Sequence, residues 1–185
     1  MRIAVYGGSF NPPHRAHAMV ARWVIESNIA DEVWLVPVFH HAFEGSQDKA
    51  LAPYDLRLSW CRVLADEIGQ CIKVSDVESK LSVPSYSIDT LNFLSVAHPE
   101  HQFFLVVGAD ILTQVDGWKD WDKIQKDHSP VVVGRPGYPA PGDTPMFPDI
   151  SSTVVRKTIA DGGDLSELLS PSVAAEIMRE NPWVD

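Results

Sequence analysis

Five short apolar runs recur along the 185-residue chain, and they constrain its fold more than any other feature. These runs comprise residues 2–6, 33–38, 71–75, 103–107 and 130–134. The intervening segments carry apolar residues at helical spacing, over residues 14–28, 54–68, 86–97 and 118–126. Continuous apolar strands that alternate with helices are typical of a parallel sheet covered on both faces. The sequence therefore predicts an α/β fold with a Rossmann-like, doubly wound parallel sheet.

The last part of the chain, from about residue 150 to 185, is predicted to be helical. One helix is expected to begin at Ser151 or Ser152 and to run to about Asp161, because a serine hydroxyl accepts from the free N–H groups of a first turn. A final helix is expected to begin at Ser170-Pro171, since proline is favoured at the first helical position. We therefore expect a C-terminal helical segment beside the sheet.

The first apolar run ends at Gly7-Gly8-Ser9-Phe10, and a helical pattern then begins with His14 and His17. Glycines let a backbone approach an anion, and the start of a helix offers free N–H groups and a positive dipole end. Two imidazoles three residues apart share one face of a helix. Because ligands of such sheets bind at the carboxyl ends of strands, the sequence predicts a phosphate site with titratable donors beside it.

Length and charge limit the classes of function. The chain, residues 1–185, suits a single domain with a full hydrophobic core. Its formal net charge of −10 argues against general nucleic-acid binding, which relies on many Lys and Arg contacts to phosphates. A nucleotide can still bind in a local basic pocket. The candidates for that pocket are Arg15, Lys49, Arg57, Arg135, Arg156 and Lys157.

The sequence shows no sign of a membrane or secreted protein. No run approaches the roughly 20 apolar residues that span a bilayer, and the first apolar run is too short for a signal peptide. Cys61 and Cys71 have no CxxC spacing, and we interpret both as buried thiols of a reducing compartment. The predicted location is the cytoplasm.

Two motifs at the ends of the chain resemble those of the nucleotidyltransferase superfamily. The glycine-rich turn with His14-Arg15-Ala16-His17 is similar to its signature, a Gly-rich turn followed by His-x-Gly-His, with Ala16 in place of the glycine. Residues 150–156, Ile-Ser-Ser-Thr-Val-Val-Arg, match its C-terminal Ile-Ser-Ser-Thr-x-x-Arg motif. Two motifs in the right order are far more specific than either alone. The expected sheet is therefore of the nucleotidyltransferase type.

Three segments in the middle of the chain resemble those of bacterial nicotinate-nucleotide adenylyltransferases. Residues 84–91, Pro-Ser-Tyr-Ser-Ile-Asp-Thr-Leu, are similar to a Pro-Ser-Tyr-Thr-x-x-Thr-Leu segment of that family. Val107-Gly108-Ala109-Asp110, with Trp118 ten residues after Gly108, resembles an Ile-Gly-x-Asp…Trp segment. Residues 135–138 resemble an Arg-Pro-Gly-Tyr connection. The resemblance thus spans nearly the whole chain in order.

The resemblance implies an adenylyl transfer in NAD biosynthesis. The 5′-phosphate of nicotinate mononucleotide would attack the α-phosphate of ATP, giving nicotinate adenine dinucleotide and pyrophosphate. Catalysis would rest on His14 and His17, as donors to phosphate oxygens, and on Arg156, as a clamp on the β- and γ-phosphates. The implied ATP site comprises Gly7, Gly8, Ser9, Phe10, His14, His17, Ile150, Ser151, Ser152, Thr153 and Arg156. The implied acceptor site comprises Tyr86, Ser87, Thr90, Gly108, Asp110, Trp118 and Arg135.

The resemblance also implies the cofactor and the partners. Mg²⁺ would arrive on the triphosphate of ATP, with no metal site made by the protein itself. The partners would be ATP and nicotinate mononucleotide, without nucleic acid or membrane. Assembly into a homo-oligomer is left open.

Two departures from the family pattern keep other activities open. Ala16 adds a β-carbon where the family's glycine allows phosphate to approach closely, so a tighter site is expected. Residues 40–49 lack the Pro-Pro-His-Lys-like segment that commonly follows the second strand in that family. One alternative is a related nucleotidyltransferase that uses another phosphorylated acceptor or CTP. The other is a nucleotide-binding homologue with weakened catalysis.

The histidine pair also allows simpler interpretations. His14 and His17 could form a metal site if folding brings His40 or His41 near them. They could also cap the helix without any chemistry.

Several aromatic residues and histidines are open to a purely structural interpretation. Trp118 and Trp121 lie three residues apart in a predicted helix, so either could serve packing alone. His98, His101 and His128 lie among polar residues, and we expect them to be exposed and without a role.

Overall fold

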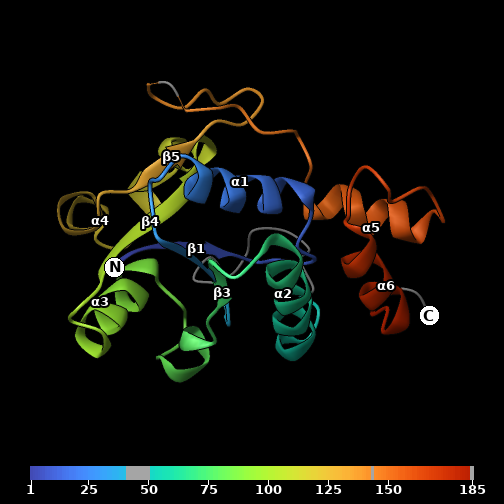
Figure 1. Ribbon diagram of the computed structural model, residues 1–185, viewed down its shortest axis with the longest axis horizontal. Helices are drawn as coiled ribbons and strands as arrows, with labels where there is room; N and C mark the ends of the chain where they lie inside the picture. Colours follow the sequence, from blue (N-terminus) through green and yellow to red (C-terminus); the bar gives the residue numbers. More distant parts are fainter. Residues whose placement is uncertain (41–50, 143, 184–185) are drawn as a thin grey trace.

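The computed structural model describes residues 1–40, 51–142 and 144–183 (Figure 1). Within these residues, five parallel strands form one sheet in the order β3-β2-β1-β4-β5. The strands are β1 (Arg2–Gly8), β2 (Glu32–Pro37), β3 (Ile72–Val74), β4 (Gln102–Gly108) and β5 (Val131–Val133). The predicted doubly wound parallel sheet is therefore confirmed.

Helices cover both faces of this sheet. The α-helices are α1 (Arg15–Glu26), α2 (Tyr54–Ile68), α3 (Ser87–Ala97), α4 (Trp121–His128), α5 (Ser152–Ala160) and α6 (Pro171–Arg179). Short 3₁₀ helices occupy η1 (Val77–Lys80), η2 (Ala109–Thr113) and η3 (Val115–Gly117). Residues of α1, α2, α5 and α6 share one apolar cluster, and residues of α3 and α4 share the other. The C-terminal helical segment is confirmed, and α6 packs against α2 (Figure 1).

The two apolar clusters explain why the strands are continuously apolar. Along β1, Ala4 faces the cluster of α1 and α2, whereas Ile3 and Val5 face the cluster of α3 and α4. All three side chains are almost completely buried. A strand covered on both faces needs apolar residues at every position. That the whole chain forms one domain stays a prediction.

The order of the strands places a ligand-binding position at the end of β1. The chain moves from β1 to β2 and β3 on one side, and then returns to β4, which pairs with β1 on the other side. Connections therefore leave β1 and β4 in opposite directions. In sheets of this kind the crevice at that switch point, at the carboxyl ends of the strands, takes the ligand.

The predicted helix over 118–126 was wrong at its start. Residues 109–113 and 115–117 form η2 and η3. Helix α4 begins only at Trp121, after Asp120 in the left-handed conformation with φ 52°. Trp118 therefore precedes the helix. Its ring still meets that of Trp121 edge to face, with centroids 5.4 Å apart.

Four smaller expectations need correction. Cys61 is buried as expected, but Cys71 is exposed, because it lies in the turn before β3. His128 is buried, with Nδ1 at 3.1 Å from the carbonyl oxygen of Phe103. His98 and His101 are half-buried rather than exposed.

In the described part of the chain, no helix is long and apolar enough to cross a membrane.

Candidate active site at the carboxyl ends of the central strands

The turn between β1 and α1 combines an open backbone with an anchored ring. A β-carbon added at Gly7 would meet no atom within 4 Å, so the space beside this residue is open. Phe10 has a φ of 43°, and its buried ring contacts Tyr6 edge to face, with centroids 5.8 Å apart. The ring also lies 4.8 Å from that of His17. The turn is thus fixed by Phe10 while the glycine leaves room for a ligand to approach the backbone.

His14 and His17 lie face to face at the start of α1. Their ring centroids are 3.7 Å apart, with an interplanar angle of 27°. The backbone N–H of His14 donates to Nδ1 of His17 at 3.1 Å. Since Nδ1 accepts, the proton of a neutral His17 ring lies on Nε2, which becomes its donor. Nδ1 of His14 is buried and has no hydrogen-bond partner among the described residues.

Both imidazoles are neutral at pH 7. Burial lowers the pKa of His14 from 6.5 to about 3, and the positive charge of Arg135 contributes to this shift. Burial also lowers the pKa of His17 well below its usual value, with further contributions from His14 and Arg135. An anion bound beside the two rings would favour the protonated forms. The pair therefore consists of uncharged donors whose protonation responds to phosphate.

Helix α5 contacts the turn directly, although more than 130 residues separate them in sequence. Oγ of Ser152 donates to the carbonyl oxygen of Pro12 at 2.9 Å. Nη1 of Arg156 donates to the carbonyl oxygen of Asn11 at 2.7 Å. These two hydrogen bonds bring both terminal motifs, and with them the starts of α1 and α5, to one place. Such helix starts attract anions.

The other residues of the C-terminal motif shape the beginning of α5. Oγ of Ser151 accepts from the backbone N–H of Val154 at 3.3 Å, as the predicted serine cap requires. Oγ1 of Thr153 accepts from Nη2 of Arg156 at 3.3 Å, which orients the half-buried guanidinium. Ile150 is buried in the cluster of α1 and α2. The motif thus anchors the helix start and directs Arg156 toward the turn.

An ion pair lies at the end of β4, the strand beside β1. Nη1 of Arg135 donates to Oδ2 of Asp110 at 3.1 Å, and Oδ1 of Asp110 is buried without a partner among the described residues. A β-carbon at Gly108 would lie 2.3 Å from that Oδ1 and 2.9 Å from Cδ of Arg135. A side chain at position 108 would therefore displace Asp110 or Arg135. The charge of Arg135 acts on both imidazoles, so this pair borders the histidines.

The remaining predicted acceptor residues gather at the start of α3. Nζ of Lys119, next to Trp118, lies 4.7 Å from the ring centroid of Tyr86 and 2.8 Å from Oδ2 of Asp89. Tyr86, Ser87 and Trp118 are half-buried there.

Thr90 differs from these neighbours. It is buried, and its Oγ1 lies 3.4 Å from both the Tyr86 carbonyl oxygen and Oε1 of Glu78. Its hydroxyl therefore engages the protein itself. Acceptor binding by these residues stays a prediction.

Arg57 holds the backbone next to the site by hydrogen bonds, a role that the sequence did not reveal. It is only 1% exposed and donates to the carbonyl oxygens of Ser9 and Val38, each at 2.8 Å, and of Ala52, at 3.0 Å. The buried amide of Asn11 accepts from the Ala52 N–H at 3.0 Å. An asparagine beside prolines signals a turn, but no sequence signal marks Arg57 as buried.

Of the six candidate basic residues, Arg135 and Arg156 lie at the site. Arg15 donates to the carbonyl oxygen of Leu169, and Lys157 pairs with Asp161 at the surface. Lys49, His41 and the segment 41–50 lie outside the described residues. In the described part, the His14–His17 pair has no third metal-ligating side chain close to it.

Ala16 is buried in the first turn of α1. Its side chain is 7% exposed and belongs to the apolar cluster with Val20 and Ala21 of the same helix. How its β-carbon affects the phosphate site stays a prediction. The methyl group points to the core because Ala16 lies on the face of α1 that packs against the sheet.

The chain resembles known proteins over most of its length. Residues 5–158 match the family model described as cytidylyltransferase-like. The chain is 41% identical over 174 residues to the "Probable nicotinate-nucleotide adenylyltransferase" of Anaeromyxobacter sp. strain K, covering 92% of this chain and 90% of that protein. It is 35% identical over 182 residues to the protein of the same name from Myxococcus xanthus strain DK1622, covering 98% and 93%.

A solved structure shares the fold. The Plasmodium falciparum nicotinic acid mononucleotide adenylyltransferase complexed with NaAD superposes with a TM-score of 0.81 at 20% identity. The match covers 98% of this chain and 97% of that one.

The buried His14 makes the stability of the free protein depend on pH. Its folded pKa, about 3, lies below the ordinary 6.5, so the unfolded chain binds a proton that the folded chain excludes. The contribution of His14 to the free energy of unfolding is therefore fully present above pH 6.5. It falls as the pH is lowered, by up to about 1.4 kcal/mol per pH unit. Urea unfolding between pH 7 and 4.5 should show a shallower loss for His14→Gln than for the wild type. Equal slopes would contradict a neutral, buried His14.

Proposed function

The chain belongs to the cytidylyltransferase-like family, and on that premise we propose that it transfers the adenylyl group of ATP to nicotinate mononucleotide. The products are nicotinate adenine dinucleotide and pyrophosphate. The observation that carries the proposal is the contact of α5 with the turn after β1, through Ser152 and Arg156. Relatives with 41% and 35% identity are named as nicotinate-nucleotide adenylyltransferases, which supports the choice of substrates.

The proposed reaction needs alignment and charge stabilisation rather than a protein nucleophile. An oxygen of the acceptor's 5′-phosphate forms a bond to the α-phosphorus of ATP. The bond from that phosphorus to the bridging oxygen breaks, and pyrophosphate leaves with the electron pair. Nε2 of His17 donates to a phosphate oxygen as negative charge grows on the leaving group. The imidazoles are neutral before ATP binds, so they first donate hydrogen bonds to the triphosphate. The negative charge of the bound triphosphate then favours their protonated forms.

Arg156 and the start of α5 complete the triphosphate site. The guanidinium donates one hydrogen bond to the carbonyl oxygen of Asn11. Its other N–H groups can donate to the β- and γ-phosphates. The nitrogen donors here do not suit Mg²⁺, which prefers oxygen ligands. Magnesium therefore enters as part of the substrate, held by the phosphates of ATP.

The acceptor is proposed to lie between β4 and the start of α3. The flat ring of Trp118 can stack on the pyridine ring, and Tyr86 and Ser87 offer donors for its carboxylate. Oδ1 of Asp110, which has no partner in the described part, can accept from a ribose hydroxyl. A cytoplasmic location and the oligomeric state stay predictions.

Pyrophosphate release tests the proposed function. The protein should be assayed with ATP or CTP in combination with nicotinate mononucleotide, nicotinamide mononucleotide or another phosphorylated acceptor. Rapid release with ATP and nicotinate mononucleotide alone is expected. Release that prefers CTP or an unrelated acceptor would replace the proposal with a related transferase. Binding of ATP without turnover would indicate a nucleotide-binding homologue.

His17 should contribute to the chemical step more than to folding. We expect His17→Ala to lower kcat by about 10²-fold or more, the usual effect of losing one transition-state donor. His17→Gln should recover part of this loss, because its amide nitrogen can replace Nε2 as a donor. Thermal unfolding of both variants provides the control. Near-normal turnover by a folded His17→Ala variant would exclude this role.

Ala16 should matter for stability and not for catalysis. Ala16→Gly removes a buried methyl group and a favourable helix residue, which should cost about 1 kcal/mol and lower Tm by about 2–4 °C. The value of kcat/KM for ATP should stay within a factor of two, because the side chain faces the core. A clear gain in kcat/KM would show that Ala16 restricts the phosphate site after all.

A further inference from the structure

A cluster of metal-ligating side chains lies far from the candidate active site. His98, Glu100 and His101 occupy the connection between α3 and β4, before the first residue of the strand. The active site lies after Gly108, at the other end of the same strand. The seven residues of β4 span about 20 Å, so the two places lie at opposite ends of this strand.

One ring nitrogen of each histidine lies near the same carboxylate oxygen of Glu100. Oε1 of Glu100 lies 3.8 Å from Nδ1 of His98 and 3.3 Å from Nε2 of His101. The ligand atoms of the three residues all lie within 4.8 Å of one another. A tetrahedral zinc ion with bonds of about 2.0–2.2 Å holds its ligands roughly 3.3–3.6 Å apart. Small side-chain adjustments therefore suffice to bring all three onto one ion.

The backbone and neighbouring rings already hold the two imidazoles in place. The His98 N–H donates to the carbonyl oxygen of Leu94, and the His101 N–H donates to that of His98 at 3.0 Å. The Trp34 ring meets the His98 ring edge to face, with centroids 5.6 Å apart. The two imidazole planes differ by only 8°. A ligand set held in this way loses little conformational entropy when it binds an ion.

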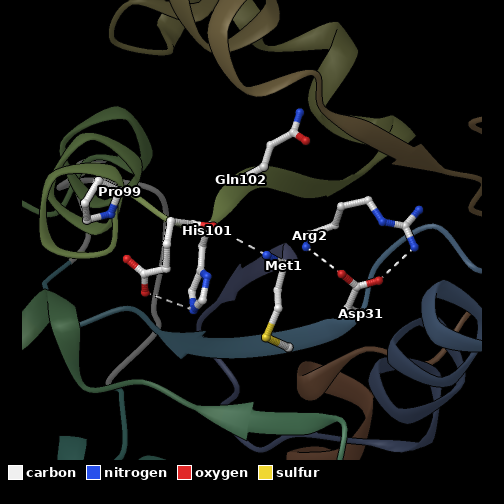
Figure 2. Close-up of a pocket in the computed structure, with 7 residues that line it drawn as sticks. Met1, Arg2, Asp31, Pro99, His101 and Gln102 are labelled. Carbon is white, nitrogen blue, oxygen red and sulfur yellow. Dashed lines mark hydrogen bonds and ion pairs between the residues drawn. The ribbon is translucent and has the colours of Figure 1, made fainter.

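A shallow pocket of about 460 Å³ is lined by Glu100 and His101 of this cluster (Figure 2). Figure 2 shows His101 on one side of Met1 and the ion pair of Arg2 and Asp31 on the other. Both oxygens of Asp31 accept from Arg2, at 2.7 and 2.8 Å. That carboxylate is engaged, so the protein ligands of an ion at this place are the two histidines and Glu100.

We propose that His98, Glu100 and His101 form a binding site for a zinc ion, with water as the fourth ligand. Two imidazoles and one carboxylate are a ligand set that zinc takes readily, whereas Mg²⁺ and Ca²⁺ prefer oxygen alone. The ion would join the end of α3 to the beginning of β4. It lies too far from the phosphate site to touch substrate, so the proposal is independent of the adenylyl transfer.

Calorimetric titration of the EDTA-treated, full-length protein with ZnCl₂, without nucleotide, tests the proposal. We expect one strong site with a Kd of about 1 μM or below. The double variant His98→Gln/His101→Gln should weaken it at least about 100-fold, and Glu100→Gln at least about 10-fold. His40→Gln, which removes an exposed imidazole elsewhere, should bind zinc as the wild type does. Unchanged affinity in the double variant would place the zinc at other residues, such as His14 and His17, and would overturn the proposal.

Two further measurements report on the same place. Zinc at 100 times its Kd should raise Tm by about 5–10 °C in the wild type and leave the double variant unchanged. Cobalt(II), which takes the same ligands, should quench tryptophan fluorescence, and Trp34→Phe should remove most of this quenching. Millimolar affinity, or a zinc-dependent Tm shift that persists in the double variant, would show that these side chains form only hydrogen bonds and ion pairs.

Discussion

The geometry of the candidate active site depends on two arginines that bind backbone carbonyls of the turn after β1. Arg57, from α2, donates to Ser9, and Arg156, from α5, donates to Asn11. The ring of Phe10 anchors this turn in the apolar cluster of α1 and α2, and the glycine, asparagine and proline residues around it need hydrogen bonds to fix their backbone. Charged donors supply strong hydrogen bonds, of about 1.5–3 kcal/mol where they are buried as Arg57 is. The turn is therefore shaped by helices distant in sequence, which makes its geometry a property of the whole fold.

The same arrangement explains how an acidic protein can bind a triphosphate. The chain carries a net charge of −10, yet Arg135 and Arg156 and the starts of α1 and α5 gather where β1 and β4 end. The two histidines add no charge there until an anion arrives, since burial keeps them neutral. Repulsion among the cations of the empty site stays small for this reason. Phosphate binding then raises the pKa of both imidazoles, because an adjacent negative charge favours the imidazolium.

The sequence predicted the fold well where local pattern and burial agree. The five strands appear within two residues of their expected bounds, and Ser151 and Ser170 cap α5 and α6 as expected. The meeting of the two terminal motifs was expected from the family resemblance alone. The direction of a side chain was harder to predict. The burial of Ala16 requires knowledge of the face of α1 that packs on the sheet, and the role of Arg57 requires the three carbonyls that meet it only in the folded chain.

Strand β4 connects the two functional places that we infer, and its packing limits how they can influence each other. Phe103, Leu105 and Val107 are buried on one face of β4 and Phe104 and Val106 on the other. A strand packed on both faces has no room for a second arrangement, because close-packed interiors resist small displacements. Coupling between distant sites requires an element with two states of different affinity. An ion at His98 and His101 therefore stabilises the folded chain as a whole, by binding it and not the unfolded chain. We therefore expect the geometry at the phosphate site to be the same whether or not the ion is bound.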